Sequence, residues 1–309
     1  MAEMRPGTPE QTAFLLALLD EGHFVATGVP GVYGRGEVFE TIRHAVDSRV
    51  TRAGAGDEPR RWAFPPVLSR EHFETSGYLK SFPHLAGSVF SFEGDEPAAR
   101  DQHERASRHE QWSGHQTMSE LVLTPAACYP VYPAVAAEGP LDPGGATVDA
   151  GGSYVFRHEP SGDPARLQMF HQREIVRIGE PETVATWRDT WRDRAIALLR
   201  DMQLEADADV ASDPFFGRTG RMLSRSQREQ ALKFEVLVPI AGPEPTAVAS
   251  FNYHQEHFTE RFGITMADGS VAHTACLGFG LERITLALLH AHGLALSDWP
   301  AEARQALEL

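Results

Sequence analysis

The sequence predicts an α+β fold in which an antiparallel β-sheet is flanked by helices, within a single domain at residues 1–309. Two patterns predict it. Strand-like segments follow one another with short turns between them, which is typical of hairpins in an antiparallel sheet. Segments with apolar residues three and four positions apart, typical of amphipathic helices, lie around these strands. With 42% hydrophobic and 23% charged residues, the chain can fill a core and is not a disordered protein.

The first part of the chain predicts two helices. Thr8-Pro9-Glu10-Gln11 supplies an N-cap, a first-turn proline and a capping box, and the apolar run after it ends at Gly22. A glycine-rich turn is expected at residues 28–36, and helical apolar spacing predicts a second helix directly after it. We expect an extended edge segment at residues 62–68, which contain two prolines, and a solvated insertion at residues 93–115.

The later part of the chain predicts most of the sheet. Two strand-like segments around a proline-containing turn form a hairpin, and an amphipathic helix follows, whose tryptophans we assign to the core. Two more strands come before a last helix that Gly293 can end. The hairpin, the amphipathic helix, the two strands and the last helix are expected at residues 152–178, 184–202, 233–240, 246–254 and 281–292.

Charge and cysteine content restrict the class of protein. The chain has 28 Lys and Arg against 43 Asp and Glu, and its net charge of −15 argues against binding to long stretches of nucleic acid. Two cysteines, Cys128 and Cys276, are too few for a secreted disulfide framework. We find no signal peptide and no apolar run near the roughly 20 residues of a membrane span, so we expect a cytoplasmic protein without membrane contact.

Several familiar site motifs are missing or weak. The chain has no phosphate-binding loop followed by lysine and no Gly-x-Ser-x-Gly elbow, and Gly278-Phe279-Gly280 lacks the third glycine of a dinucleotide-binding turn. His254-x-x-His257 could hold a metal on a helix, but it lacks the four-residue step of zincin signatures. We therefore interpret these two histidines as structural.

Polar residues recur on shared faces of the predicted strands, because residues two apart in a strand point the same way. Either these faces line one open cleft, or they are the solvated faces of an antiparallel sheet. The second interpretation is the commoner one for a single strand, and the co-occurrence of several sets favours the first. The sets are Arg157 with Glu159, Phe170 with Gln172 and Glu174, Lys233 with Glu235, and Ser250 with Asn252 and His254.

Two segments of the chain resemble motifs of a known family. Phe156 to Glu159, followed by a loop and Arg166 to Glu174, resembles motif 2 of class II aminoacyl-tRNA synthetases, and Gly278 to Arg283 resembles motif 3. A weaker resemblance to motif 1, which forms the dimer interface in that family, lies at about residues 38–78. The resemblance implies a class II catalytic-core fold and a homodimer. Motif 2, an insertion helix region and motif 3 would lie at about residues 152–178, 184–208 and 278–292.

The chain departs from true synthetases in ways that point to a related group. The stretch after Arg283 is too short for an anticodon-binding domain, and a net charge of −15 does not suit a tRNA surface, so no tRNA-binding arm is expected. A seryl-type core with Cys128 and Cys276 is similar to the amino acid:carrier protein ligases. That resemblance implies adenylation of glycine or alanine by ATP with Mg²⁺, and transfer to the phosphopantetheine thiol of a carrier protein.

The resemblance also implies roles for individual residues. Arg157 and Arg283 would be catalytic, with Arg157 on the α-phosphate and the substrate carboxylate. Glu159 would accept the adenine amino group, and Phe170 would stack on the adenine face opposite Arg283. Arg166 would meet the outer phosphates. The implied ATP-binding set is Arg157, Glu159, Arg166, Leu167, Phe170, Lys233, Glu235, Ser250, Asn252 and Arg283, with Glu235 as the candidate magnesium ligand.

Cys128, Glu174 and Cys276 form a candidate zinc site. Two thiolates and a carboxylate suit tetrahedral zinc with one position open, which would take the substrate's amino group. Glu174 and Arg157 are thus the expected amino acid contacts. Two cysteines so far apart in sequence are more often buried core residues, and it is the motif context that favours a metal.

Two other functions stay open at this point. One is an enzyme that loads a tRNA or a small RNA, which a basic stripe on the surface would favour. The other is a synthetase-like regulator without chemistry, which has no need of the full ATP-binding set. For the ligase, carrier proteins are typically acidic, so we expect a basic docking patch among Arg188, Arg192 and Arg194.

Overall fold

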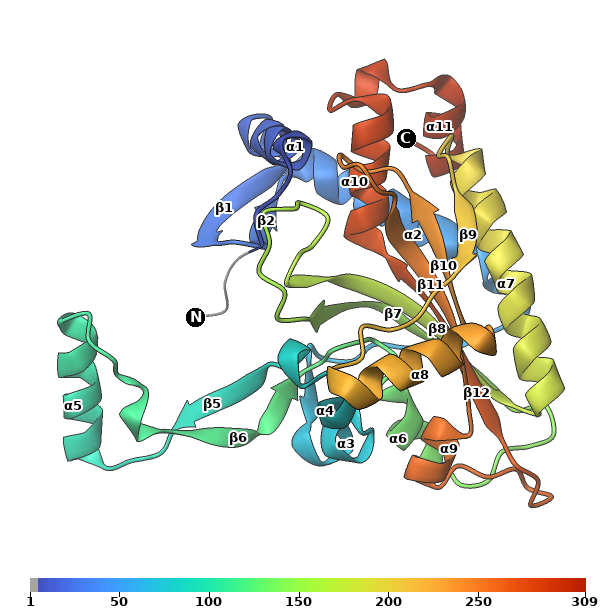
Figure 1. The fold of residues 1–309 in the computed structure, drawn as a ribbon, viewed down its shortest axis with the longest axis horizontal. Coiled ribbons are helices and arrows are strands. Elements are labelled where there is room, and N and C mark those ends of the chain that lie inside the picture. The colour runs from blue at the N-terminus through green and yellow to red at the C-terminus, as the bar shows by residue number, and fades with distance from the viewer. Residues whose placement is uncertain (1–4) are drawn as a thin grey trace.

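A seven-stranded sheet forms the centre of the protein (Figure 1). This computed structural model describes residues 5–309, and for residues 218 and 219 it describes the backbone alone; the first four residues of the predicted domain lie outside it. Neighbouring strands are antiparallel, as predicted, except that β3 runs parallel to β7. In spatial order the strands are β3 (Arg60–Trp62), β7 (Ala146–Phe156), β8 (Met169–Gly179), β12 (His273–Gly280), β11 (Thr246–Gln255), β10 (Lys233–Val238) and β9 (Asp207–Val210).

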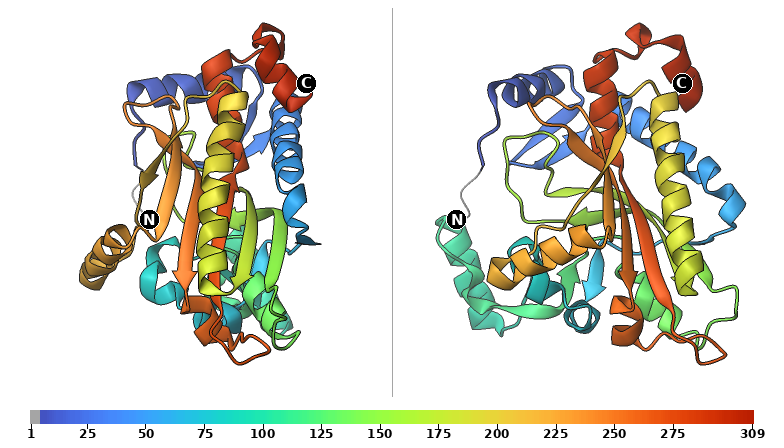
Figure 2. Two further views of the ribbon diagram at one scale, coloured as in Figure 1. Left: turned by 90° about the vertical axis from the view of Figure 1, so that its right-hand side faces the viewer. Right: turned by 45° about the vertical axis from the view of Figure 1, so that its right-hand side comes forward.

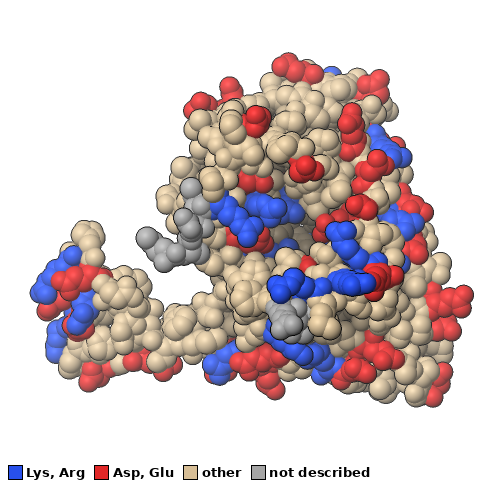
Figure 3. All heavy atoms as spheres, in the orientation of Figure 1, with Lys and Arg blue, Asp and Glu red and all other residues tan. Residues whose placement is uncertain are grey.

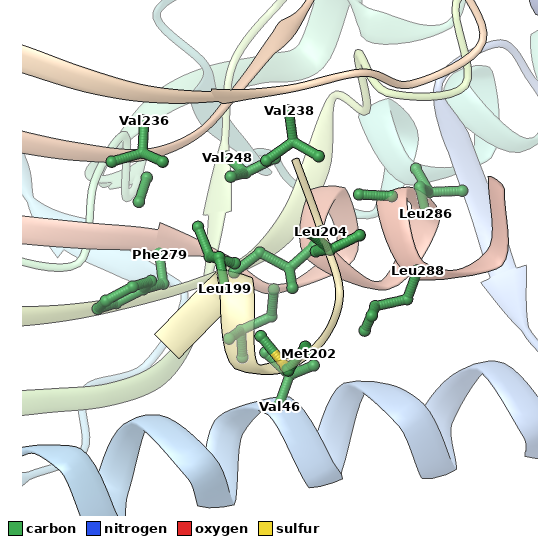
Figure 4. Packing of buried hydrophobic residues seen from close by; sticks show 14 of the residues in the cluster. Val46, Leu199, Met202, Leu204, Val236, Val238, Val248, Phe279, Leu286 and Leu288 are labelled. Atoms are coloured by element: carbon green, nitrogen blue, oxygen red, sulfur yellow. The ribbon is translucent and has the colours of Figure 1, made fainter. Parts of the chain in front are cut away.

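Four helices pack on one side of this sheet. Helix α7 (Pro181–Asp201) runs alongside the strands (Figure 2) and contacts β8, β10, β11 and β12. Helix α10 (Leu281–His292) packs on the sheet and on α2 (Glu37–Ala53), and α11 (Ala301–Leu307) contacts α2 and α7. The apolar stripes of these helices meet the sheet in the main core. Figure 4 shows this packing for Val46, Leu199, Met202, Leu204, Val236, Val238, Val248, Phe279, Leu286 and Leu288.

The N-terminal segment forms a helix and a hairpin. Helix α1 (Pro9–Asp20) begins with the predicted capping box, since the Gln11 N–H donates to Thr8 and the Thr8 N–H donates to the Gln11 side chain. The expected glycine-rich turn is instead a hairpin of β1 (Phe24–Val29) and β2 (Val32–Arg35). Gly31 has φ +77°, which allows the tight turn between the two strands.

A second, three-stranded sheet has the order β4-β6-β5, with β4 at Val67–Ser69, β5 at Ser88–Phe92 and β6 at Gln116–Leu123. Beyond it, β5 and β6 continue as a two-stranded ribbon that ends in α5 (Glu96–Ser107). We call residues 88–123 the arm. Figure 1 shows the arm projecting from the body, so the insertion expected at residues 93–115 is its tip.

The sequence did not predict α8 or β12. Helix α8 lies in a polar stretch with few apolar positions, and β12 is apolar on both faces, so it shows no strand-like alternation. No helix within residues 5–309 has the length and apolar character of a membrane span. The remaining helices are α3 (Arg70–Thr75), α4 (Tyr78–Ser81), α6 (Val131–Ala136), α8 (Gly217–Glu229) and α9 (His257–Phe262), with four 3-10 turns at Ala55–Asp57, Pro83–Leu85, Ser113–His115 and Leu296–Asp298.

Candidate active site

A cavity of about 500 Å³ opens on the side of the sheet that faces away from α7 and α10. Strands β8, β10, β11 and β12 form its floor, and residues of α4, α8 and α9 form its walls. In Figure 3, Lys and Arg side chains gather around the hollow on this face. The predicted residues that line the cavity are Cys128, Arg157, Glu159, Phe170, Glu174, Lys233, Glu235, Ser250, Asn252, Cys276 and Arg283.

Strand register explains why these residues meet. Across four strands, Glu235 pairs with Ser250, Ser250 with Gly278, and Gly278 with Glu174. Paired residues share a face, so this row points into the cavity. A Cβ on Gly278 would lie 3.0 Å from Glu174 Oε1, so glycine at this position leaves room for the carboxylate. The next row brings Lys233, Asn252 and Cys276 to the same face.

Two residues of the predicted ATP-binding set do not line the cavity. Leu167 is 7% exposed and packs in the main core, because its apolar side chain turns towards the helices. Arg166 lies beside the cavity, where its Nη1 is 3.4 Å from Glu159 Oε2 and its Nε is 3.7 Å from Asp163 Oδ2. Arg166 therefore lies next to Glu159, which lines the cavity. The side chain of Leu167 is buried in the core and does not face the cavity.

Arginines and an aromatic ring gather at one end of the cavity, which we call the arginine end (Arg157, Glu159, Phe170 and Arg283). Arg157 donates from Nε to the Pro125 carbonyl over 3.2 Å. Arg283 donates to the carbonyls of Ala165 and Ala247, each over 2.8 Å. Burial, with repulsion from Arg166 and Arg157, lowers the pKa of Arg283 to about 10, so it stays charged at neutral pH. These fixed cations suit a phosphate ligand.

Cys128, Glu174 and Cys276 meet at the other end, the cysteine end. One ligand atom from each lies within 4.8 Å of the others, and all three side chains are buried. The backbone N–H of Cys128 donates to the Glu174 carboxylate, and Cys276 Sγ lies 3.8 Å from Glu174 Oε1. Two sulfurs and one carboxylate are a donor set that zinc prefers, so the residues fit such an ion.

Burial affects the acidity of the cysteine end. Burial raises the pKa of Glu174, and burial together with the hydrogen bond that the Cys128 thiol donates to Cys276 raises the pKa of Cys128 well above its usual range. For Cys276, the hydrogen bond with Cys128 lowers the pKa, but burial and repulsion from Glu174 outweigh it and the pKa is raised. A cation bound here would reduce the free-energy cost of burying the ionised forms of these three side chains, because it compensates their negative charge.

Sequence reasoning missed Asp213, which lies in a loop after β9 and belongs to no motif. Lys233 Nζ is 2.6 Å from Asp213 Oδ1 and 2.9 Å from Glu235 Oε1. Burial opposes the charge of Lys233, but attraction from Asp213 and Glu235 outweighs burial and raises its pKa. His254 was interpreted as structural, yet it lines the cavity with its Nε2 3.6 Å from Cys276 Sγ.

The prediction of a basic patch on α7 is wrong, because its arginines are buried or paired with acidic residues. Arg188 is buried and lies 2.8 Å from Asp189, and Arg192 is paired with Asp189 and Asp193. Arg194 is 3.5 Å from Asp57. The reason is that acidic residues alternate with these arginines and the helix packs on the sheet, which the pattern of arginines alone did not show.

Comparison with known proteins identifies relatives along the whole chain. No protein-family profile matches it. It is 45% identical over 306 residues to amino acid–acyl-carrier-protein ligase 1 of Bradyrhizobium diazoefficiens, covering 98% of this chain and 93% of the relative, and 42% identical over 294 residues to ligase 2 of that organism, covering 94% and 87%. It is 28% identical to the type-2 serine–tRNA ligase of Methanopyrus kandleri over 285 residues.

The fold is shared with class II synthetases. A crystal structure of seryl-tRNA synthetase from M. kandleri with tRNA superposes with a TM-score of 0.82 at 21% identity, covering all of this chain but 62% of that one. A seryl-tRNA ligase from Naegleria fowleri superposes with a TM-score of 0.68 at 12% identity. Residues 5–309 contain no separate anticodon-binding domain. With a class II catalytic-core fold and such close relatives along its length, the chain belongs to the amino acid–acyl-carrier-protein ligase family of enzymes.

Proposed function

We propose that this ligase activates glycine or alanine as an aminoacyl-adenylate and transfers it to the phosphopantetheine thiol of a carrier protein. The observation that carries the proposal is that one cavity holds both the arginine end and the cysteine end. The two Bradyrhizobium relatives support it, because each is named as a ligase of an amino acid to an acyl-carrier protein. We treat residues 1–309 as one catalytic domain that acts in the cytoplasm.

In the first step, a carboxylate oxygen of the amino acid attacks the α-phosphorus of ATP and pyrophosphate leaves. Arg157 would balance the charge that develops on the α-phosphate, and its hydrogen bond to Pro125 holds it in place beforehand. Phe170 and Arg283 would hold the adenine ring between them, with Glu159 on its amino group. Glu235 contacts Lys233 through Oε1, and we keep it as the candidate ligand for Mg²⁺ bound with ATP.

The cysteine end would bind the amino acid. Cys128, Glu174 and Cys276 would hold zinc, and a bound zinc ion would supply a Lewis-acid position for the substrate's amino group. His254 lies next to Cys276, Phe258 packs on His254, and Tyr129 packs on Phe258, so three ring side chains that line the cavity would restrict the space for a substrate side chain. This supports glycine or alanine.

In the second step, the carrier's thiol attacks the carbonyl carbon of the mixed anhydride, AMP leaves, and the thiol proton passes to solvent. We place the docking surface on α8 in place of α7. Arg221, Arg225 and Arg228 are exposed on α8, where a single acidic residue, Glu229, pairs with Arg225 over 2.7 Å, while Leu223 and Gln227 of the same helix line the cavity. A basic helix at the cavity opening suits an acidic carrier whose prosthetic group must reach inside.

We also propose a homodimer. Strand β3 is an edge of the central sheet, in the motif 1 region, and it exposes Arg60 and Arg61. On the arm, Phe90 and Met118 are paired across the ribbon and are 55% and 38% exposed, and Phe92 shares their face. An isolated two-stranded ribbon with an apolar face is only marginally stable in water, so contact with a second copy would stabilise it.

The test is mass spectrometry of acylated products. The protein is incubated with ATP, Mg²⁺, Zn²⁺, all twenty amino acids, total tRNA and a phosphopantetheinylated carrier protein. The expected product is the carrier with one glycyl or alanyl group. Acylated tRNA would replace the proposal with an RNA-loading enzyme. If none of the twenty amino acids supports ATP–pyrophosphate exchange, the proposal is contradicted too, and a regulator without chemistry is left.

A further inference from the structure

Two side chains of β11 converge on the sulfur of Cys276. Asn252 Nδ2 donates to Sγ over 3.5 Å, and His254 Nε2 lies 3.6 Å from the same atom. Asn252 is the direct partner of Cys276 across the ladder, so their side chains lie on one face. The sulfur therefore has two nitrogen neighbours from the adjacent strand, besides Glu174 and Cys128.

A bulge in β11 puts His254 in this position. Tyr253 pairs with Ala275, but the next pair joins Gln255 to Thr274, so His254 is the extra residue. Gln255 has φ +54°, in the left-handed region that disfavours residues other than glycine. Bulges often redirect a side chain beside an active site, and strain of this kind persists where the surroundings require it.

The ring of His254 is fixed on several sides. Its Nδ1 lies 3.1 Å from Thr274 Oγ1, and Thr274 is fully buried. The rings of Phe258 and Tyr132 meet it edge to face, with centroids 4.9 and 6.2 Å away. Among the described residues, the cluster of ligand atoms within 4.8 Å of one another comprises Cys128, Glu174 and Cys276, so His254 lies beside the metal ligands and is not one of them.

We infer that Asn252 and His254 are positioning residues for the Cys276 thiolate: their N–H groups hold its sulfur in the orientation that a metal at the cysteine end requires. This inference rests on the proposed zinc site. A metal-bound thiolate only accepts hydrogen bonds, so Nε2 of a neutral His254 must carry the proton, and Nδ1 then accepts from the Thr274 hydroxyl. Groups that orient a metal ligand in this way affect metal affinity without touching the ion.

The experiment measures metal binding to the purified full chain, by chelator competition for Zn²⁺ and by absorption spectra of the Co²⁺-substituted protein. His254→Phe keeps a ring of similar size and removes the donor, and His254→Gln restores an N–H near the position of Nε2. Asn252→Ala removes the second donor. His257→Phe is the matched control, because His257 lines the same cavity but bonds to the Ser76 carbonyl.

We expect His254→Phe and Asn252→Ala to weaken zinc binding roughly 10- to 100-fold. Their sulfur-to-cobalt charge-transfer band should move to longer wavelength, because the thiolate loses a donor. His254→Gln should recover most of the affinity and the band, and His257→Phe should change neither. Melting temperatures identify any variant that fails to fold, and Asn252→Ala and His254→Gln then carry the test.

Other outcomes overturn the inference in different ways. Wild-type protein that binds no zinc refutes the proposed metal site itself. Zinc binding that is normal in wild type and unchanged in folded His254→Phe and Asn252→Ala refutes only the positioning role. Cobalt spectra of His254→Phe that show a lost nitrogen ligand, with no recovery in His254→Gln, would make His254 a ligand instead.

Discussion

The guanidinium of Arg157 lies over the ring of Phe170, with 5.5 Å between the guanidinium carbon and the ring centroid. The two residues come from opposite sides of the β7–β8 hairpin, and the Pro125 carbonyl fixes the arginine from a third segment. The cation and the ring at the arginine end are thus held together by the fold itself.

This arrangement predicts the effect of Arg157→Lys. Lysine keeps the charge but loses the planar group and the Nε contact, so amino acid–dependent ATP–pyrophosphate exchange should fall roughly 10²- to 10³-fold, the loss seen when a fixed transition-state donor is removed. The melting temperature should hardly change. Exchange within threefold of wild type would show that Arg157 does not contact the reacting phosphate.

Cys276→Ser should remove the metal and the activation of amino acid together. Serine is a poor zinc ligand, so we expect metal content, measured by mass spectrometry of the digested protein, to fall from about one zinc per chain to a small fraction of that. ATP binding by calorimetry serves as the control and should persist. Full exchange activity in metal-free protein would contradict the role of the cysteine end.

The pair of Lys233 and Asp213 predicts a pH-dependent stability. Burial alone would raise the pKa of Asp213, but attraction from Lys233 outweighs it and lowers the pKa. The carboxylate therefore stabilises the fold above the unfolded pKa near 4, and this contribution is lost as the pH falls through the lower folded value. The pKa of Lys233 is raised in the folded state, so the contribution of the charged lysine to folding stability persists up to about pH 10.

Asp213→Asn should accordingly lower the free energy of unfolding at pH 7 by about 2 kcal/mol, less than for a fully buried pair because Glu235 still contacts Lys233. The difference from wild type should shrink below about pH 4. Urea titrations from pH 3 to 8 measure it. Asp207→Asn, in a largely exposed pair with Arg200, is the control and should have no measurable effect. A difference that is constant over this range would exclude the ion pair as its cause.

Charge reversal on α8 should separate the two half-reactions. Arg221→Glu combined with Arg225→Glu should raise the KM for an acidic carrier about 10-fold, with a weaker salt dependence, while ATP–pyrophosphate exchange stays unchanged. Arg192→Glu on α7 is the matched control, and it should leave carrier loading intact. An equal loss of both half-reactions would place α8 outside the docking surface.

The exposed face of the arm predicts the oligomeric state. Wild type should sediment as a dimer at micromolar concentration, and Phe90→Asp combined with Met118→Asp should shift the protein towards monomer. Val271→Asp is the control. It adds a charge at another apolar residue, which is 54% exposed, and it should leave the protein dimeric. A variant that remains dimeric would restrict the interface to the β3 side of the molecule, and a monomeric wild type would refute the dimer.

Sequence patterns predicted the fold well wherever a local rule applied. The capping box at Thr8 and Gln11 placed α1, the helical spacing placed α2 and α7, Gly293 marked the end of α10, and the turn in motif 2 placed the β7–β8 hairpin. Strand β12 was missed because it is buried on both faces and so lacks alternation. Helix α5 at the tip of the arm and helix α8 were missed because their polar sequences leave the choice of structure to tertiary context.

The residues that the resemblance implied for the site mostly share one cavity, but their roles at the site remain predictions. The meeting of Cys128 with Cys276 depends on the loop before α6, where the N–H groups of Ala127 and Cys128 donate to the side chains of Gln172 and Glu174 on β8, and no spacing rule predicts such a contact. Asp213 and His254 show the limit more clearly. Asp213 lies in an irregular loop and contacts Lys233, and a bulge in β11 directs His254 towards Cys276. Neither contact can be predicted from the sequence, because each depends on the folded chain.

Strand β8 carries residues of both ends of the cavity, Phe170 and Glu174, and its neighbour β12, which carries Cys276, is hydrogen-bonded along both of its edges. Opening β12 would therefore release Cys276 from its neighbours and at the same moment free the base of α10, which holds Arg283. Amides of β8, β12 and β11 should exchange with deuterium in one cooperative step, at the free energy of global unfolding. We therefore expect no stable, partly unfolded state in which one end of the cavity is formed and the other is not.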